Sequence, residues 1–138
     1  MIDLKGKNIL ITGGASGIGR ACVDLFLEAN ASIIYVLDII SNIREIDETE
    51  KVKFFCCDVS NEEEVINVIQ NITKLDILIN CVGIHPPERL ISSYSAKQFN
   101  RVMNINLTSA FIMCHYLEPL LSNAKNASVI NISSMVGS

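Results

Sequence analysis

The run Thr12-Gly13-Gly14-Ala15-Ser16-Gly17-Ile18-Gly19 decides the fold of this 138-residue chain. It follows a strand-like stretch, Lys7 to Ile11, and opens a helix-like stretch from Ile18 to Ala29. A glycine-rich turn between a strand and a helix lets backbone N–H groups approach a phosphate, and the helix N-terminus adds partial positive charge there. The run therefore predicts a pyrophosphate-binding turn and, with it, a dinucleotide ligand.

Apolar and amphipathic segments alternate along the rest of the chain. The short apolar runs are typical of fully buried strands, and the segments between them repeat apolar residues at helical spacing. The expected strands are Lys7–Ile11, Ser32–Leu37, Val52–Cys57, Leu75–Asn80 and Ser128–Ile132. Such alternation predicts βαβ units and an α/β fold whose parallel sheet is covered by helices on both faces. The polar stretch 41–50 fits a short helix and a loop equally well.

Two later helices have recognisable start signals. Ser60 with Glu63, and Ser95 with Gln98, are spaced as capping boxes at helix N-termini. The second box precedes a long helix that we expect to stop near Pro119. Its expected apolar face consists of Phe99, Val102, Met103, Ala110, Cys114 and Leu117.

Composition narrows the class of protein. Hydrophobic residues make up 49% of the chain and charged residues 19%, which is typical of one globular domain. The net charge of −4 argues against nucleic acid or an anionic membrane as a partner. No apolar run reaches the length of about 18 residues that a membrane span needs. The N-terminus also lacks a signal-peptide pattern, so the cytoplasm is the expected location.

The cysteines give no sign of a metal site. They are Cys22, Cys56, Cys57, Cys81 and Cys114. Their odd count, their apolar neighbours and the lack of a C-x-x-C spacing favour reduced, buried thiols over a disulfide framework or a zinc site. We therefore expect no metal.

An acidic residue closes the second expected strand. Asp38 lies nineteen residues after Gly19, where a carboxylate accepts hydrogen bonds from the adenosine ribose hydroxyls. The same charge would repel a 2′-phosphate, and Ser16 supplies no cation to offset it, so NAD is favoured over NADP. The plain structural alternative is a solvated aspartate at the end of a strand. The glycine spacing is a weak signal alone, but together with the flanking strand, the helix and Asp38 it is specific.

These motifs together resemble the short-chain dehydrogenase/reductase family, in its single-domain subgroup. The glycine-rich run is similar to the family's phosphate-binding turn. Further stretches resemble its motifs in the same order: Asp58-Val59 beside the adenine, Asn80-Cys81-Val82-Gly83 after the fourth strand, Asn106 in a helix, and Asn131-Ile132-Ser133-Ser134 in the fifth-strand segment. The resemblance covers essentially the whole chain. Cys81 departs from it, because the family has asparagine at that position.

The resemblance implies a fold, an activity and a set of site residues. The fold would be a Rossmann-type doubly wound parallel sheet with strand order 3-2-1-4-5. The activity would be NAD(P)-dependent oxidation or reduction of a secondary alcohol or ketone, a 3-oxoacyl-carrier substrate being one candidate, in a homo-oligomer. Ser134 would polarise the carbonyl, and Asn106 would hold a water that leads to a lysine. The cofactor would be held by Thr12, Gly13, Ser16, Gly17, Ile18, Gly19, Asp38, Asp58, Val59, Asn80 and Gly83.

The residues themselves leave alternatives open at the two catalytic positions. Asn106 falls within the expected apolar stripe of its helix, so we expect its amide to be buried. It could then brace adjoining strands instead of relaying protons. Ser134 is expected to point toward the ligand crevice, although a hydroxyl there could also cap a helix or turn.

The family's proton donor is a tyrosine in the pattern Tyr-x-x-x-Lys. None of the three tyrosines, Tyr35, Tyr94 and Tyr116, begins that pattern. Family spacing would put it beyond Ser138, so we expect residues 1–138 to be a C-terminally incomplete NAD(P)-binding domain with little or no turnover. The alternative is a non-catalytic NAD-binding or partner-binding Rossmann protein.

Overall fold

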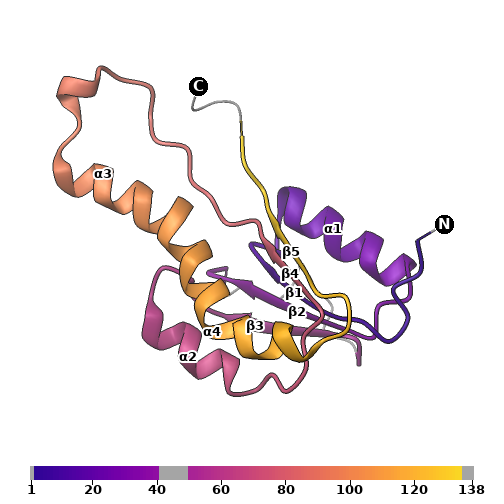
Figure 1. The fold of residues 1–138 in the computed structure, drawn as a ribbon. Helices are drawn as coiled ribbons and strands as arrows, with labels where there is room; N and C mark the ends of the chain where they lie inside the picture. The colour runs from indigo at the N-terminus through magenta and orange to yellow at the C-terminus, as the bar shows by residue number, and fades with distance from the viewer. Residues whose placement is uncertain (1, 41–49, 135–138) are drawn as a thin grey trace.

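The computed structural model describes residues 2–40 and 50–134, which form a five-stranded parallel sheet with helices on both faces (Figure 1). The strands are β1 (Asn8–Thr12), β2 (Ile33–Asp38), β3 (Val52–Cys56), β4 (Ile77–Asn80) and β5 (Ser128–Asn131). They lie in the order β3-β2-β1-β4-β5, which confirms the predicted Rossmann-type topology. The sequence left a short helix and a loop open for the stretch 41–50. Residues 41–49 of this stretch lie outside the described residues.

Helices cover the sheet because its central strands are apolar on both faces. The helices are α1 (Gly17–Glu28), α2 (Glu62–Ile69), α3 (Ala96–Met103) and α4 (Ser109–Asn123). Side chains alternate between the faces of a strand. Leu10 of β1 therefore packs in the cluster that contains residues of α2 and α4, whereas Ile9 and Ile11 pack in the cluster around Val23 of α1.

The two edge strands are more exposed than predicted. Lys53 and Cys56 of β3 are exposed, and so is every residue of β5, with Val129 at 45% and Ile130 at 46%. An edge strand has a neighbour on one side only. The strand order that the resemblance implies already puts β3 and β5 at the edges, although their apolar runs alone indicate full burial. The expectation that all cysteines are buried is wrong: Cys56 of the edge strand β3 is exposed, and only Cys57 is fully buried. The other three, Cys22, Cys81 and Cys114, are half-buried.

The predicted helix starts are right in one case and displaced by one residue in the other. The capping box of Ser95 and Gln98 is present at the start of α3. At α2 the N-cap is Asn61, whose Oδ1 accepts hydrogen bonds from the backbone N–H groups of the second and third helical residues. Ser60 does not cap the helix, because its hydroxyl donates to Asp58 Oδ1 at 2.6 Å.

The expected long helix differs from the prediction in two ways. A π-helical segment, η3 (Asn104–Thr108), separates α3 from α4, and α4 continues past Pro119 to Asn123. Pro119 is exposed, so the carbonyl it leaves unbonded can face water, while the buried Leu117 and Leu121 hold the helix on the sheet.

Of the predicted apolar face only one residue, Leu117, is buried, and Val102, Ala110 and Cys114 are half-buried. Leu117 is fully buried, but Phe99 is 59% exposed and Met103 36% exposed. Figure 1 shows the reason, since α3 and the short 3₁₀-helix η2 (Ile91–Ser93) extend beyond the ends of the strands. No helix among the described residues is long and apolar enough to span a membrane.

Candidate functional site

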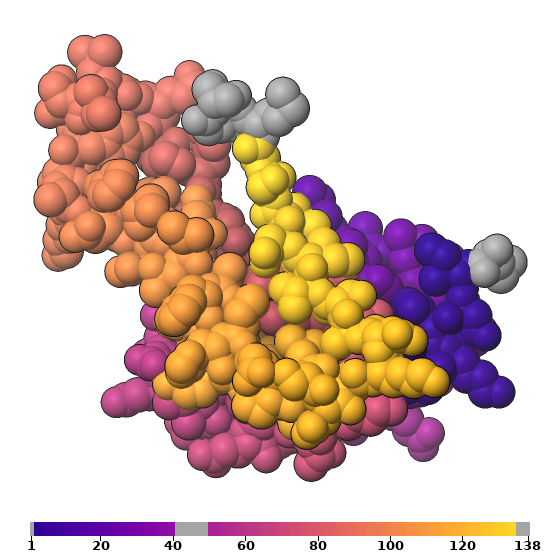
Figure 2. All heavy atoms as spheres, viewed as in Figure 1, coloured from indigo at the N-terminus to yellow at the C-terminus, as the bar shows by residue number. Residues whose placement is uncertain are grey.

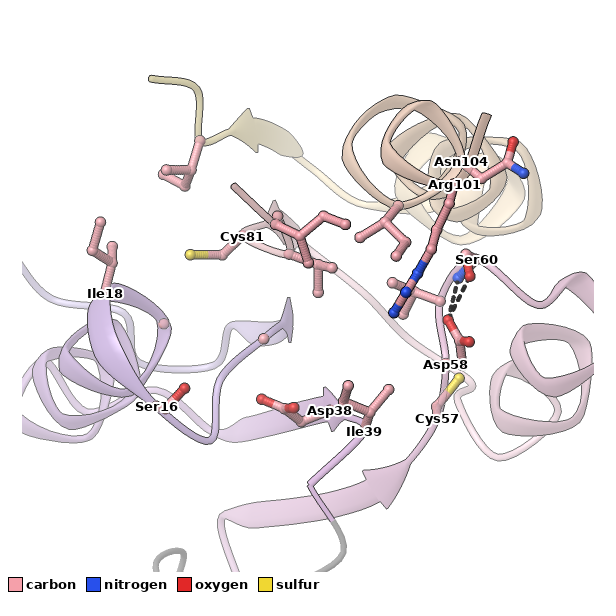
Figure 3. A pocket seen from close by; sticks show the side chains of 18 of the residues that line it. Ser16, Ile18, Asp38, Ile39, Cys57, Asp58, Ser60, Cys81, Arg101 and Asn104 are labelled. Carbon is pink, nitrogen blue, oxygen red and sulfur yellow. Dashed lines mark hydrogen bonds between the residues drawn. The ribbon is translucent and has the colours of Figure 1, made fainter. Parts of the chain in front are cut away.

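A cavity of about 1090 Å³ lies at the carboxyl ends of the strands. This is the position where open parallel sheets bind ligands. Its walls come from the glycine-rich turn, the end of β2, the segments after β3 and β4, and α3 with η3 (Figure 3). The predicted cofactor residues in its lining are Gly13, Ser16, Ile18, Gly19, Asp38, Asp58, Val59 and Gly83.

The glycine-rich turn is folded tightly against itself. Gly13 and Gly17 have φ values of +70° and +54°, in the left-handed region that favours glycine. A Cβ atom on Gly19 would lie 2.1 Å from the carbonyl oxygen of Gly13. The turn can therefore reach this conformation only if position 19 has no side chain.

The N-terminus of α1 is open toward the cavity. Ser16 occupies the N-cap position, but its side chain makes no capping hydrogen bond and no acidic residue lies in the first turn. The first N–H groups of a helix need an acceptor from outside the helix. Within the described part of the chain no side chain caps them, which suits a site for a phosphate group.

Asp38 is held rigidly beside that turn. The residue is 8% exposed. Its Oδ2 accepts a hydrogen bond from the Ala15 N–H at 3.0 Å, and its Oδ1 accepts one from the Ile40 N–H at 3.3 Å. The turn is also tied to β2 through the Gly13 N–H, which donates to the Leu37 carbonyl at 2.7 Å. Hydrogen bonds therefore tie Asp38, the glycine-rich turn and the end of β2 to one another.

The segment after β3 forms a second polar wall. Asp58 Oδ1 accepts hydrogen bonds from the Ser60 N–H at 2.9 Å and from its hydroxyl, while the Asp58 N–H donates to Glu64 Oε2 at 2.8 Å. Burial, and then the carboxylates of Glu64 and Asp58, raise the pKa of the Cys57 thiol to about 12. Cys57 lines the cavity, and the raised pKa favours its protonated, less nucleophilic form at neutral pH.

Residues 7–138 match the family model for short chain dehydrogenases. The chain belongs to the short-chain dehydrogenase/reductase family. It is 37% identical over 146 aligned positions to a tropinone reductase homolog of Arabidopsis thaliana, and the alignment covers 98% of this chain and 55% of that protein. The chain spans about half the length of the curated relatives it matches.

Solved structures of the family have the same fold. A 3-oxoacyl-[acyl-carrier protein] reductase from Brucella melitensis matches with a TM-score of 0.86 at 28% identity, covering 96% of this chain and 53% of that one. A short chain dehydrogenase from Leptospira borgpetersenii, solved with bound NAD+, matches with a TM-score of 0.85 at 27% identity and covers 98% and 54% of the two chains.

Three residues that the family pattern assigns to the cofactor do not line the cavity. Gly17 shapes the turn through its positive φ. Thr12 is 1% exposed, and its Oγ1 accepts a hydrogen bond from the Cys81 N–H at 3.0 Å. Asn80 Nδ2 donates to Asn131 Oδ1 at 2.8 Å. Thr12 therefore links β1 to the segment after β4, and Asn80 links β4 to β5, while a direct contact of either with the cofactor stays a prediction.

Replacing Thr12 by valine tests its structural role. We expect Thr12→Val to lower the free energy of unfolding by about 1–3 kcal/mol, because the Cys81 N–H then loses its acceptor in a buried place. NAD affinity should stay within twofold of the wild type. Urea unfolding and calorimetry measure the two quantities, and Thr73→Val at an exposed position is the control. A loss of affinity at unchanged stability would instead assign the hydroxyl to the cofactor.

Asn106, the helix asparagine of the family, lies within the π-helical segment. Its Nδ2 donates to the Ile84 carbonyl at 2.9 Å, and its Oδ1 accepts from the Ile84 N–H at 2.7 Å. The expected burial is wrong, because Asn106 is exposed where α3 and η3 extend beyond the sheet. The side chain therefore braces the segment after β4 against the helix. The sequence left open a bracing role between adjoining strands, and the structure shows bracing of a loop segment instead.

Ser134, the family's serine position, is exposed and follows β5 by three residues. It is absent from the cavity lining, although Ile132 of the same segment is part of it. Its orientation toward the crevice and its catalytic role stay predictions.

Sequence reasoning missed the wall that α3 and η3 contribute. Lys97, Arg101, Asn104 and Ile105 line the cavity from this side. Figure 3 shows the Arg101 side chain pointing from α3 into the cavity, toward Asp58 and Ser60. The four-residue spacing of Lys97 and Arg101 places both on one helix face, but nothing local in the sequence indicates that this face borders the cavity.

Proposed function

We propose that residues 1–138 form a domain that binds NAD in this cavity. The observation that carries the proposal is the uncapped N-terminus of α1 beside the fixed carboxylate of Asp38. The turn suits the diphosphate, since its glycines leave the space that Cβ atoms would fill. Asp38 would then accept hydrogen bonds from the adenosine ribose, and Asp58 with Val59 would border the adenine.

The charge of Asp38 supports a preference for NAD over NADP. At an effective dielectric constant of about 20, two like unit charges ~4 Å apart repel each other by about 4 kcal/mol. A 2′-phosphate bound near this carboxylate would meet repulsion of that order. The ribose hydroxyls of NAD would instead find an acceptor already oriented by Ala15 and Ile40.

We further propose an oxidoreductase activity on a secondary alcohol or ketone, with NAD as the group that exchanges the hydride. Family membership supports this proposal. Ser134 would hydrogen-bond the substrate oxygen, and Asn106 would keep the segment after β4 in position through its paired hydrogen bonds to Ile84. A homo-oligomer in the cytoplasm is part of the same proposal. The 138-residue chain by itself should turn over little, because none of its tyrosines begins the pattern Tyr-x-x-x-Lys.

Calorimetry of the 138-residue chain with NAD tests the first proposal. We expect a saturable heat with one site per chain, and weaker binding of NADP because of the Asp38 charge. NADH-linked assays with secondary alcohols and ketones should show little turnover. The absence of any heat at millimolar NAD, with the chain folded by circular dichroism, would contradict cofactor binding.

A further inference from the structure

Arg101 is a cationic side chain in the cavity that the proposed cofactor contacts do not use. It belongs to the last turn of α3 and lines the cavity together with Ile105 of η3. Figure 3 shows its side chain reaching from the α3 side toward Asp58 and Ser60, while Asp38 lies across the cavity on the β2 side. The guanidinium therefore lies at the end of the cavity that is distant from Ile18 and the start of α1.

No ion pair accounts for this orientation. Within residues 2–40 and 50–134, the Arg101 guanidinium has no carboxylate oxygen within 4.0 Å and no hydrogen-bond partner. Asp58 directs its Oδ1 to the N–H and hydroxyl of Ser60 instead. Arg101 is exposed, so holding its long side chain in the cavity has an entropic cost that a bound ligand would have to offset.

The surroundings of Arg101 suit a flat, uncharged ring system. Val59, which is 4% exposed, and Ile105 supply apolar surface to this end of the cavity, and Asp58 supplies a hydrogen-bond acceptor at its rim. A guanidinium is planar and weakly hydrated, so it stacks on aromatic faces more readily than an ammonium group does. An aromatic base bound between these walls would present its face to Arg101.

We propose that Arg101 closes the adenine end of the cofactor site by stacking its guanidinium on the adenine ring. This inference rests on the proposed binding of NAD and adds a positioning contact from α3 to it. It also gives α3, which extends beyond the sheet, a part in cofactor binding.

Substitution of Arg101 by methionine tests the contact. Methionine keeps a long, unbranched side chain with high helix propensity, but it removes the positive charge and the planar guanidinium group. We expect Arg101→Met to raise the Kd for NAD by roughly three- to thirtyfold, the range that a cation–π contact covers. The Kd for nicotinamide mononucleotide, which has no adenine, should not change. Arg101→Lys should be intermediate, because it keeps the charge without the plane.

The control is Lys53→Met, which removes one positive charge at an exposed position of β3 outside the cavity lining. NMR titrations can follow both ligands into the millimolar range. Equal NAD affinity of the wild type and Arg101→Met would overturn the inference and leave the proposed function intact. No binding by the wild type would instead refute the proposed function. A larger loss for NADP than for NAD would show that the guanidinium acts on the 2′-phosphate, which also overturns stacking.

Discussion

Gly19→Ala should abolish measurable NAD binding. The added Cβ would lie 2.1 Å from the Gly13 carbonyl oxygen and 3.0 Å from the Gly14 Cα, and both are backbone atoms that no side-chain rotation can move aside. The turn must therefore open, and its N–H groups lose their common direction toward a phosphate. We expect a loss of affinity well above tenfold, with a destabilisation of about 1–3 kcal/mol from the overpacking. Calorimetry with NAD and thermal unfolding measure the two effects.

Gly6→Ala is the matched control. Gly6 has a φ of +79°, but a Cβ there would have no neighbour within 4 Å, and the residue lies outside the cavity lining. This variant should lose stability through backbone strain alone and keep its NAD affinity. If Gly19→Ala bound NAD as tightly as Gly6→Ala does, the turn would not be the phosphate site.

Asp38→Asn should reverse or abolish the preference for NAD over NADP. The amide oxygen can still accept the Ala15 N–H, but the negative charge opposing a 2′-phosphate is gone. We expect NAD affinity to fall, because a charge-assisted acceptor becomes a neutral one. NADP affinity should rise, so that the ratio of the two Kd values shifts by roughly tenfold or more. Calorimetric titrations with both cofactors give this ratio directly.

Glu28→Gln removes the same charge from an exposed position at the end of α1, outside the cavity lining. This variant should leave the ratio of the Kd values for NAD and NADP unchanged. The comparison separates a local effect of Asp38 from an effect of net charge. An unchanged ratio in Asp38→Asn would mean that the carboxylate serves only to hold the turn through Ala15.

The placement of the glycine-rich turn beside Asp38 could be predicted because the elements that carry them are close in the sequence. The glycines, the start of α1 and the acid at the end of β2 lie within one βαβ unit, so their spacing along the chain determines their distance in space. Thr12 and Asn80 show where this reasoning stops. They are paired in the register of β1 and β4. The Thr12 side chain bonds to the segment after β4 and the Asn80 side chain bonds to β5, and neither residue lines the cavity.

The sequence by itself determined the alternation of strands and helices and the place of the glycine-rich turn between β1 and α1, because apolar periodicity and glycine spacing act over a few residues. The strand order followed from the family resemblance, and the structure confirms it. Only the tertiary structure decided the pairing of Asn106 with Ile84 and the entry of Arg101 into the cavity. Each of these depends on which segment packs beside another across many residues of chain. The space-filling view shows β5 and α4 side by side on the surface, with α3 extending away from them (Figure 2). Contacts of that range have no local signature, since they arise from how the helices and the sheet bury their apolar surface together.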